Sequence, residues 1–200
     1  MSELGFALFD TAIGCCGIVW SGRGVVGVQL PERSETATRS RVQRRFPMAR
    51  GAAPPADVQR VIDDIVALLA GEQRPLGGVM LDLQDVPDFN RRVYEVARTI
   101  QAGATLTYGE VAERLGDRTL ARDVAAALAQ NPCPIIVPCH RVMAAGGKTG
   151  GFSAPGGVRT KLRLLSIEGA EPAQSAQPEA PMLFDRLPLM ARGRRGASGS

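Results

Sequence analysis

Hydrophobic positions in the first part of the chain form short runs that are separated by turn residues. The runs have the length and boundaries of strands, and they lie at residues 5–10, 17–20, 24–30 and 79–83. Ser21-Gly22-Arg23-Gly24 predicts a hairpin turn between two of these strands. From 56 to 70 the apolar residues recur at helical spacing instead, and Gly71 ends the pattern. This part of the chain therefore combines strands with a helix.

The segment from 31 to 55 is polar and irregular by comparison. Its arginines are at positions 33, 39, 41, 44, 45 and 50. Two interpretations stay open for the backbone, a short helix and a surface segment without regular structure. We interpret the arginines as a solvated face rather than a site for nucleic acid.

Helical periodicity dominates the second part of the chain. Helices are predicted at 88–103, 107–115, 119–130 and 158–168. Asp88 is the expected N-cap of the first helix. The turn Gly116-Asp117-Arg118 joins two short helices, which is typical of a helix-turn-helix. The apolar run 135–137 predicts a buried strand that ends at Pro138, and a glycine-rich loop follows from 146 to 157.

These patterns predict an α+β fold with two domains and a tail. A small strand-rich domain is expected at 1–84, and a helical domain with the helix-turn-helix and a reactive cysteine is expected at 85–170. Residues 171–200 are rich in Pro, Ala, Ser, Gln, Gly and Arg, a composition typical of disorder. Three alternatives stay open for the more apolar stretch 181–189: it docks on the body of the protein, binds a partner or belongs to the tail.

Composition and charge narrow the class of protein. The formal net charge is +4, and nearly all of the positive charge is arginine, Lys148 and Lys161 being the only lysines. A modestly basic chain is compatible with nucleic-acid binding and does not require it. No apolar run approaches the length of a membrane span, and no basic segment leads into an apolar stretch at the start. We expect a cytoplasmic protein without membrane contact.

The candidate chemistry lies at Cys139, which stands directly before His140, the only histidine. A thiol reacts as its thiolate, and a neighbouring imidazole promotes thiolate formation near neutral pH. One histidine and four scattered cysteines resemble neither a zinc site nor a disulfide framework. The sequence therefore predicts a nucleophilic cysteine, with no metal and no cofactor.

Several motifs resemble the methylated-DNA–protein-cysteine methyltransferase family, also called O6-alkylguanine-DNA alkyltransferases. They are Tyr108-Gly109-Glu110, Ala121-Arg122-Asp123-Val124, Asn131-Pro132, Pro138-Cys139-His140-Arg141-Val142, Gly151-Phe152-Ser153, Leu164-Leu165 and Glu168-Gly169. The resemblance runs from about residue 88 to 169. It implies a DNA repair protein that moves an alkyl group from O6 of guanine irreversibly onto its own cysteine, once per molecule. O4-alkylthymine is a further candidate substrate.

The resemblance also implies the role of each residue in the reaction. Cys139 would be the alkyl acceptor, and His140 would act as its base through a bound water. Glu168 would orient the histidine and stabilise the imidazolium, as in other orienter–base–nucleophile arrangements. Tyr108 would donate a proton to the leaving guanine, and the positive charge of Lys161 would favour the thiolate.

The implied partner is double-stranded DNA that contains O6-alkylguanine, bound by a monomer through the minor groove. The damaged base has to leave the stack to reach the cysteine, and Arg122 would fill the gap. The other expected contacts with DNA are small residues of the same helix, Ala121, Ala125, Ala126 and Ala127. Asn131 would tie this helix to the active-site turn. Pro134, Phe152 and Ser153 would line the pocket for the alkylated base.

Two departures from the family concern the pocket and the recognition helix. Phe152 stands where many relatives have tyrosine, so one pocket hydroxyl is missing. Alanines replace the paired glycines that some relatives carry in the recognition helix, and the zinc ligands of some relatives' first domain are absent as well.

Three other classes of protein were weighed against this function. A cysteine hydrolase or transferase that turns over would need an oxyanion hole, and nothing in the sequence specifies one. A protein that binds lesions without repair lacks the reactive cysteine, whereas Cys139 is present. A helix-turn-helix regulator would normally dimerise and needs no Cys-His pair.

Overall fold

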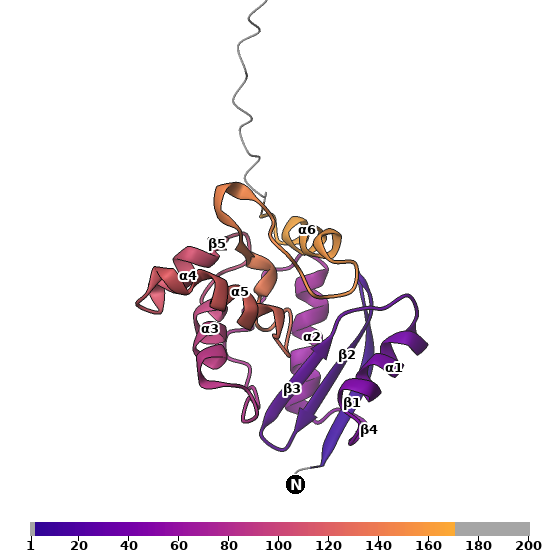
Figure 1. Ribbon diagram of the computed structural model, residues 1–200. Coiled ribbons are helices and arrows are strands. Elements are labelled where there is room, and N and C mark those ends of the chain that lie inside the picture. Colours follow the sequence, from indigo (N-terminus) through magenta and orange to yellow (C-terminus); the bar gives the residue numbers. More distant parts are fainter. Residues whose placement is uncertain (1–2, 171–200) are drawn as a thin grey trace, which may run out of the picture.

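Four strands of the first part of the chain form one sheet. The structure is a computed structural model that describes residues 3–170. The strands are β1 (Leu4–Thr11), β2 (Gly14–Ser21), β3 (Gly24–Gln29) and β4 (Ala49–Gly51). Their order is β3-β2-β1-β4, with β1 to β3 antiparallel and β4 parallel to β1 (Figure 1). The three main strands and the hairpin turn from Ser21 to Gly24 confirm the pattern-based prediction.

Two helices cover opposite faces of this sheet. Successive residues of a strand point to opposite faces, and β2 shows this directly. Val19 packs with Val42 of α1 (Glu35–Arg45), whereas Ile18 belongs to the larger core that contains Ile65 of α2 (Ala56–Leu69). The prediction of a helix at 56–70 is confirmed, and the undecided segment 31–55 contains α1 with Ser34 as its N-cap.

The second part of the chain is mainly helical. Its elements are α3 (Asp88–Arg98), β5 (Leu106–Thr107), α4 (Tyr108–Arg114), η1 (Arg118–Leu120), α5 (Ala121–Ala129), η2 (Cys139–Arg141), β6 (Val142–Met143), η3 (Ala145–Gly147) and α6 (Val158–Ile167). Thr107 and Glu110 form a capping box at the start of α4. α4 and α5 pack together across a tight turn, which confirms the helix-turn-helix and the α+β fold class.

Two sequence predictions about local structure are wrong. Residues 79–83 form no strand; only Leu81 makes an isolated bridge, to Val25. Asp88 is the first residue of α3 rather than its N-cap, and its carboxylate instead accepts a hydrogen bond from Arg91. Neither change moves a helix away from its predicted place.

The predicted buried strand at 135–137 is also absent, and a compact buried turn takes its place. Ile135 has φ +77°, a left-handed conformation that a strand does not contain. The amide of Val137 donates to the carbonyl of Cys133 at 2.8 Å, which closes the turn. Pro134 and Pro138 flank these residues, and proline has no amide hydrogen to donate to a sheet. The turn leads directly into η2, which begins at Cys139.

This turn connects the two parts of the molecule. The amide of Val28 in β3 donates a hydrogen bond to the carbonyl of Pro132 at 2.9 Å. One hydrophobic core runs from Ile18 and Val28 on the sheet to Val111 and Val124 in the second part. The domain boundary predicted near residue 84 lies in the segment between α2 and α3 and stays a prediction. Among residues 3–170, none of the helices is long and apolar enough to cross a membrane.

Candidate active site

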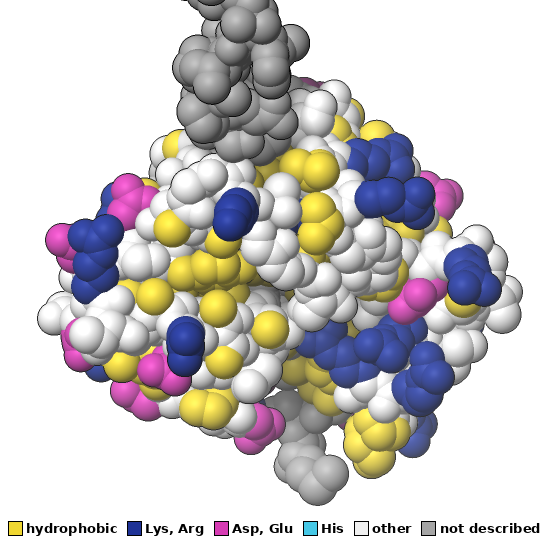
Figure 2. All heavy atoms as spheres, turned by 45° about the horizontal axis from the view of Figure 1, so that its top comes forward, with side chains coloured by type: hydrophobic (Ala, Val, Ile, Leu, Met, Phe, Trp, Pro, Cys, Tyr) yellow, Lys and Arg dark blue, Asp and Glu magenta, His cyan; other side chains and the backbone are white. Residues whose placement is uncertain are grey.

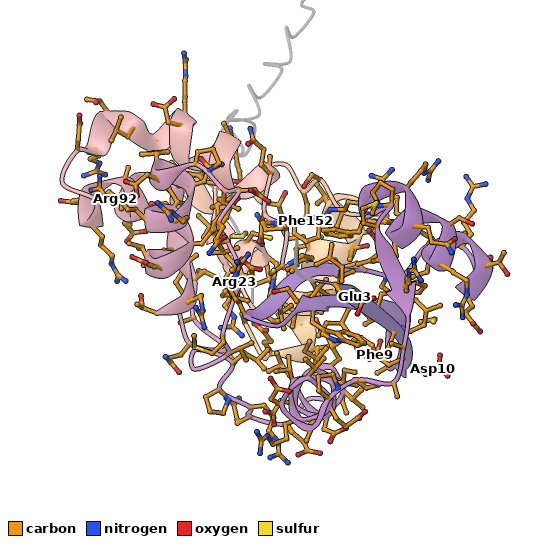
Figure 3. The ribbon with its side chains drawn as sticks, turned by 90° about the horizontal axis from the view of Figure 1, so that it is seen from below. Glu3, Phe9, Asp10, Arg23, Arg92 and Phe152 are labelled. Atoms are coloured by element: carbon orange, nitrogen blue, oxygen red, sulfur yellow. The ribbon has the colours of Figure 1, made fainter. Side chains whose placement is uncertain are left out.

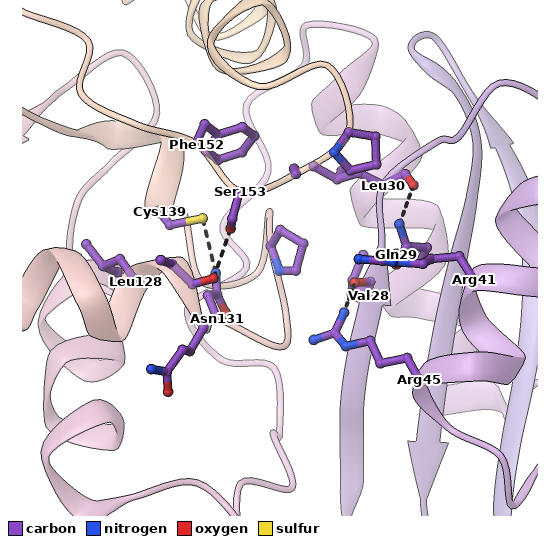
Figure 4. A pocket seen from close by; sticks show the side chains of 15 residues that line it. Val28, Gln29, Leu30, Arg41, Arg45, Leu128, Asn131, Cys139, Phe152 and Ser153 are labelled. Carbon is purple, nitrogen blue, oxygen red and sulfur yellow. Dashed lines mark hydrogen bonds between the residues drawn. The ribbon is translucent and has the colours of Figure 1, made fainter.

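Cys139 is the first residue of η2, and Asn131 at the end of α5 fixes its position. The Asn131 Nδ2 group donates to the carbonyl of Val137 at 2.8 Å and contacts Cys139 Sγ at 3.2 Å (Figure 4). Asn131 Oδ1 accepts a hydrogen bond from the amide of Cys133 at 2.9 Å. One side chain therefore connects α5, the buried turn and the thiol.

The surroundings of Cys139 act on its pKa in opposite directions. Burial raises the pKa of the Cys139 thiol, because a thiolate loses hydration there. The hydrogen bond from Asn131 and the positive charge of Lys161 lower the pKa in part. The net shift is upward, so Cys139 rests as a thiol at neutral pH. A base is needed to convert it to the nucleophile.

His140, Arg141 and Glu168 form a buried polar cluster behind the thiol. His140 Nε2 lies 2.9 Å from Glu168 Oε1, and Arg141 donates to both carboxylate oxygens at 2.8 Å. Arg141 Nη1 also donates to the carbonyl of Ile100 in a short hydrogen bond. The side chains of His140 and Glu168 are 1% and 3% exposed, so these groups depend on one another for polar partners.

These contacts determine which groups of the cluster are charged. Burial by itself raises the pKa of Glu168, but the hydrogen bonds and charges of His140 and Arg141 outweigh it and bring the pKa to about 2. Burial lowers the pKa of His140, and the partly opposing effect of Glu168 does not restore it. At neutral pH the cluster therefore contains an ionised carboxylate and a neutral imidazole.

The hydrogen-bond pattern also assigns the imidazole tautomer. An ionised carboxylate only accepts hydrogen bonds, so the proton of neutral His140 is on Nε2. His140 Nδ1 is then an acceptor, and it is buried without a hydrogen-bond partner among residues 3–170. A buried, unpaired basic nitrogen on the residue that follows Cys139 is a candidate general base.

Arg141 is a member of this cluster whose role the sequence did not reveal. Its place in the motif Pro138-Cys139-His140-Arg141-Val142 assigns it no function. The structure shows that the Arg141 guanidinium binds Glu168 through two nitrogens and is itself only 9% exposed. A bidentate pair of this kind fixes the orientation of a carboxylate. The only sequence signal was a charged residue inside an otherwise apolar segment.

Lys161 of α6 is a further buried charged residue of the site. Its ammonium donates to the carbonyls of Val142 and Thr149 at 2.6 Å each. Burial lowers the pKa of Lys161 to about 8, which leaves the ammonium mostly charged at neutral pH. Lys161 Nζ also lies 5.9 Å from the centre of the Tyr108 ring. The lysine therefore links β6, the glycine-rich loop and Tyr108.

A cavity of about 390 Å³ brings Cys139 together with residues of α4, α5 and the glycine-rich loop. Its lining consists of Tyr108, Ala125, Leu128, Ala129, Cys139, Gly151, Phe152 and Ser153. Gly150 has φ +67°, and a Cβ there would lie 3.0 Å from the Tyr108 hydroxyl, so glycine permits the loop to approach Tyr108. Burial raises the pKa of Tyr108, as does the neighbouring Cys139, and the phenol stays protonated.

A second cavity, of about 280 Å³, meets the first at Cys139 and extends towards the sheet (Figure 4). Leu128, Ala129, Phe152 and Ser153 also line both cavities. Pro134 lines only this second cavity, so it lies apart from Tyr108. In the view from below, Phe152 lies between the helices of the second part and the sheet (Figure 3).

The other predicted contact residues lie along α5 outside the cavities. Arg122 is exposed in the first turn, and its side chain makes no hydrogen bond or ion pair with any residue from 3 to 170. Ala126 is exposed as well, and Ala121 is half-buried against the core. Ala127 is 2% exposed and packs in the core, so the expectation that it contacts DNA is wrong. The structure thus places Arg122 on the surface of the helix whose far end, at Asn131, contacts the thiol.

Comparison with known proteins identifies relatives of this chain. Residues 88–170 match the family model described as the 6-O-methylguanine DNA methyltransferase DNA binding domain. A methylated-DNA–protein-cysteine methyltransferase of Methanothermobacter thermautotrophicus is 35% identical over 153 residues, covering 76% of this chain and 78% of the relative. The enzyme of the same description from Mycobacterium bovis is 40% identical over 131 residues, covering 66% of this chain and 74% of the relative.

Solved structures agree with these sequence relatives. Mycobacterium tuberculosis OGT in complex with DNA is similar with a TM-score of 0.67 and 32% identity, covering 82% of this chain and 92% of that one. The O6-methylguanine-DNA methyltransferase of the archaeon Pyrococcus kodakaraensis gives a TM-score of 0.64 at 27% identity, covering 84% of this chain and 99% of that one. The similarity therefore includes the sheet as well as the helical part.

Proposed function

The chain belongs to the 6-O-methylguanine DNA methyltransferase family, and from this premise we propose that Cys139 is the residue that receives the alkyl group. Family members repair DNA by transferring an alkyl group from the damaged base to a cysteine of their own, and this chain is a DNA repair enzyme of that kind. Cys139 is the only cysteine among residues 3–170 that lines both cavities described above. This position is the observation that carries the proposal.

The proposed reaction is an in-line displacement at the alkyl carbon. His140 Nδ1 removes the thiol proton through a bridging water, and Glu168 stabilises the imidazolium that forms. Cys139 Sγ then forms a bond to the alkyl carbon as the carbon–O6 bond breaks, and the electron pair of that bond goes to guanine. The thioether product is stable to water, so each molecule reacts once.

In this step Tyr108 acts on the leaving guanine, and Lys161 acts on the attacking sulfur. The phenol of Tyr108 lines the same cavity as Cys139 and stays protonated, so it can donate a proton to the guanine as it leaves. The ammonium of Lys161 lowers the pKa of the Cys139 thiol. Hydrogen bonds to the carbonyls of Val142 and Thr149 fix the ammonium in place, so that its charge can stabilise the developing thiolate.

DNA binding by α5 completes the proposal. The family relationship supports double-stranded DNA as the partner, and one structural relative was solved with DNA bound. We propose that a monomer binds the minor groove through α5, with Ala121, Ala125 and Ala126 close to the DNA backbone. The alkylated base leaves the stack, and the free guanidinium of Arg122 takes its place.

The test is the mass of the intact protein after incubation with a duplex that contains one O6-methylguanine, followed by peptide mapping. We expect one methyl group per molecule, located on Cys139, with no further gain in mass. Cys139→Ala should still bind the duplex and gain no methyl group. Cys133→Ala is the matched control, because Cys133 lies in the adjacent turn and lines neither cavity, so this variant should still be methylated. A methyl group on any other residue would overturn the assignment.

A further inference from the structure

The second cavity beside Cys139 is positively charged on one side. Its lining includes Arg41 and Arg45 from α1, and within residues 3–170 no aspartate or glutamate lines it. Among the residues that the structure describes, none with a charged side chain lines the cavity that holds Tyr108. The two spaces that meet at the thiol therefore differ in chemistry, one being neutral and the other cationic.

Within residues 3–170, Arg45 forms no ion pair and Arg41 forms only a long one. Arg45 donates a hydrogen bond to the carbonyl of Val28 at 3.3 Å and lies 5.1 Å from the centre of the Phe46 ring. Arg41 Nε lies 4.0 Å from Glu32, at the outer limit of an ion pair. Both guanidinium groups thus keep hydrogen-bond donors available towards the cavity. In Figure 2, arginine and lysine side chains gather on the lower right of the molecule beside a hollow.

The geometry of the displacement relates the two cavities to parts of the substrate. In an in-line reaction the sulfur, the alkyl carbon and O6 lie on one line, and the other groups on that carbon project sideways. If guanine occupies the neutral cavity beside Tyr108, a substituent on the reacting carbon has to extend away from this line. The cationic cavity opens from Cys139 and provides space in such a direction.

We propose that Arg41 and Arg45 make this site selective for O6-alkylguanines whose alkyl group carries a negative charge, such as a carboxymethyl group. The inference rests on the proposed function and adds a substrate class to it. The carboxylate would accept hydrogen bonds from the guanidinium groups, which match carboxylates in geometry.

The two arginines reduce an electrostatic repulsion in this reaction. A carboxylate on the reacting carbon repels the approaching thiolate, and two guanidinium groups offset that repulsion. The step remains balanced: the bond between Sγ and the CH₂ carbon forms, the bond to O6 breaks, and its electron pair leaves with guanine. The thiol proton goes to His140, the departing guanine takes a proton from Tyr108, and the carboxylate stays on the transferred carbon as part of the thioether.

The experiment compares single-turnover transfer from three duplexes of identical sequence. They contain O6-methylguanine, O6-carboxymethylguanine or the neutral amide O6-carbamoylmethylguanine, which resembles the carboxymethyl group in shape. The proteins are the wild type, Arg41→Gln, Arg45→Gln, the double variant with both glutamines, and Arg45→Lys. Arg44→Gln is the matched control, because Arg44 is an exposed arginine of the same helix that does not line the cavity.

For the double variant we expect transfer of the carboxymethyl group to slow about tenfold, since a charge-assisted pair is lost. Transfer of the methyl and carbamoylmethyl groups should stay within about twofold, which also shows that the variant is folded. Arg44→Gln should leave all three rates unchanged, and Arg45→Lys should retain part of the preference because it keeps the charge.

Three results would overturn the inference. An equal loss on all three duplexes would mean that the arginines bind DNA phosphates, and unchanged carboxymethyl transfer would mean that they do not reach the substrate. A wild type that transfers none of the three groups would overturn the proposed function itself. A wild type that transfers all three groups at equal rates would overturn only this inference.

Discussion

The polar residues behind Cys139 and the outer face of α5 belong to one candidate site but are organised in opposite ways. The inner cluster consists of His140, Arg141, Lys161 and Glu168, which are buried and paired with one another or with backbone carbonyls. On the outer face of α5, Arg122 and Ala126 are exposed, and Arg122 has no partner among residues 3–170.

This contrast separates two requirements of the reaction. Chemistry needs groups whose orientation and ionisation are fixed before the substrate arrives, and buried hydrogen bonds provide that. Recognition of DNA needs donors that are still free. We therefore expect changes in the inner cluster to affect stability and transfer together, and changes on the outer face to affect transfer alone.

The largest expected effect is that of Glu168→Gln. The variant leaves the buried charge of Arg141 without its ionic partner, which typically costs about 3–5 kcal/mol in the free energy of unfolding. It also removes the charge that stabilises the imidazolium, so transfer should slow by about 100-fold or more. Urea denaturation and single-turnover transfer measure the two effects. Glu113→Gln, at an exposed carboxylate, is the control and should change neither. If Glu168→Gln kept the stability of the wild type, the proposed difference between the buried inner cluster and the outer face of α5 would be wrong.

A pH titration of stability sharpens the same comparison. The pKa of Glu168 falls from its ordinary 4.5 to about 2 in the folded protein. A lowered carboxyl pKa contributes stability that is present above the ordinary value and is lost as pH falls towards the folded value, here ~3 kcal/mol. The difference in unfolding free energy between wild type and Glu168→Gln should therefore shrink between pH 4.5 and about 2. A difference that stays constant over this window would show that Glu168 is not held ionised.

Asn131→Ala should have an intermediate effect. It leaves the amide of Cys133 unpaired and removes one of the two hydrogen bonds to the carbonyl of Val137, which costs about 1–3 kcal/mol. It also removes a contact that lowers the pKa of Cys139, so the pH profile of transfer should move to higher pH. The matched control is Asn90→Ala, a buried asparagine that bonds Gln130 rather than the active-site turn. Asn90→Ala should lose stability without a shift in the pH profile of transfer. An equal shift in Asn90→Ala and Asn131→Ala would mean that the shift comes from the loss of stability rather than from the lost contact with Cys139.

The smallest effect on stability is expected for Arg122→Ala, within about 0.5 kcal/mol, as for other surface substitutions. Its effect on function should be specific: transfer from duplex DNA slows about tenfold, whereas transfer from free O6-alkylguanine is unchanged. Arg159→Ala, at an exposed arginine on α6, serves as the control. Equal losses on duplex and free base would remove Arg122 from its proposed role in filling the stack.

The differences between predicted and observed elements have simple physical causes. Helices α2 and α6 were predictable because each buries one face and so repeats apolar residues at helical spacing. The strands β1 to β3 were predictable because each is a short apolar run bounded by turn residues. α1 gives no such signal, since only Thr38 and Val42 are buried in it. The turn before Cys139 was mistaken for a strand because a short apolar run indicates burial but not backbone direction.

The sequence by itself determined the reacting groups, because the order Pro138-Cys139-His140-Arg141-Val142 places a thiol beside the only imidazole. Only the tertiary structure decided which nitrogen of His140 is free, that Arg141 fixes Glu168, and that the arginines of α1 reach the cavity of Cys139. The reason is that these relations join segments far apart in the chain. Packing of the sheet against the helices brings them together, and no local pattern of residues encodes that packing.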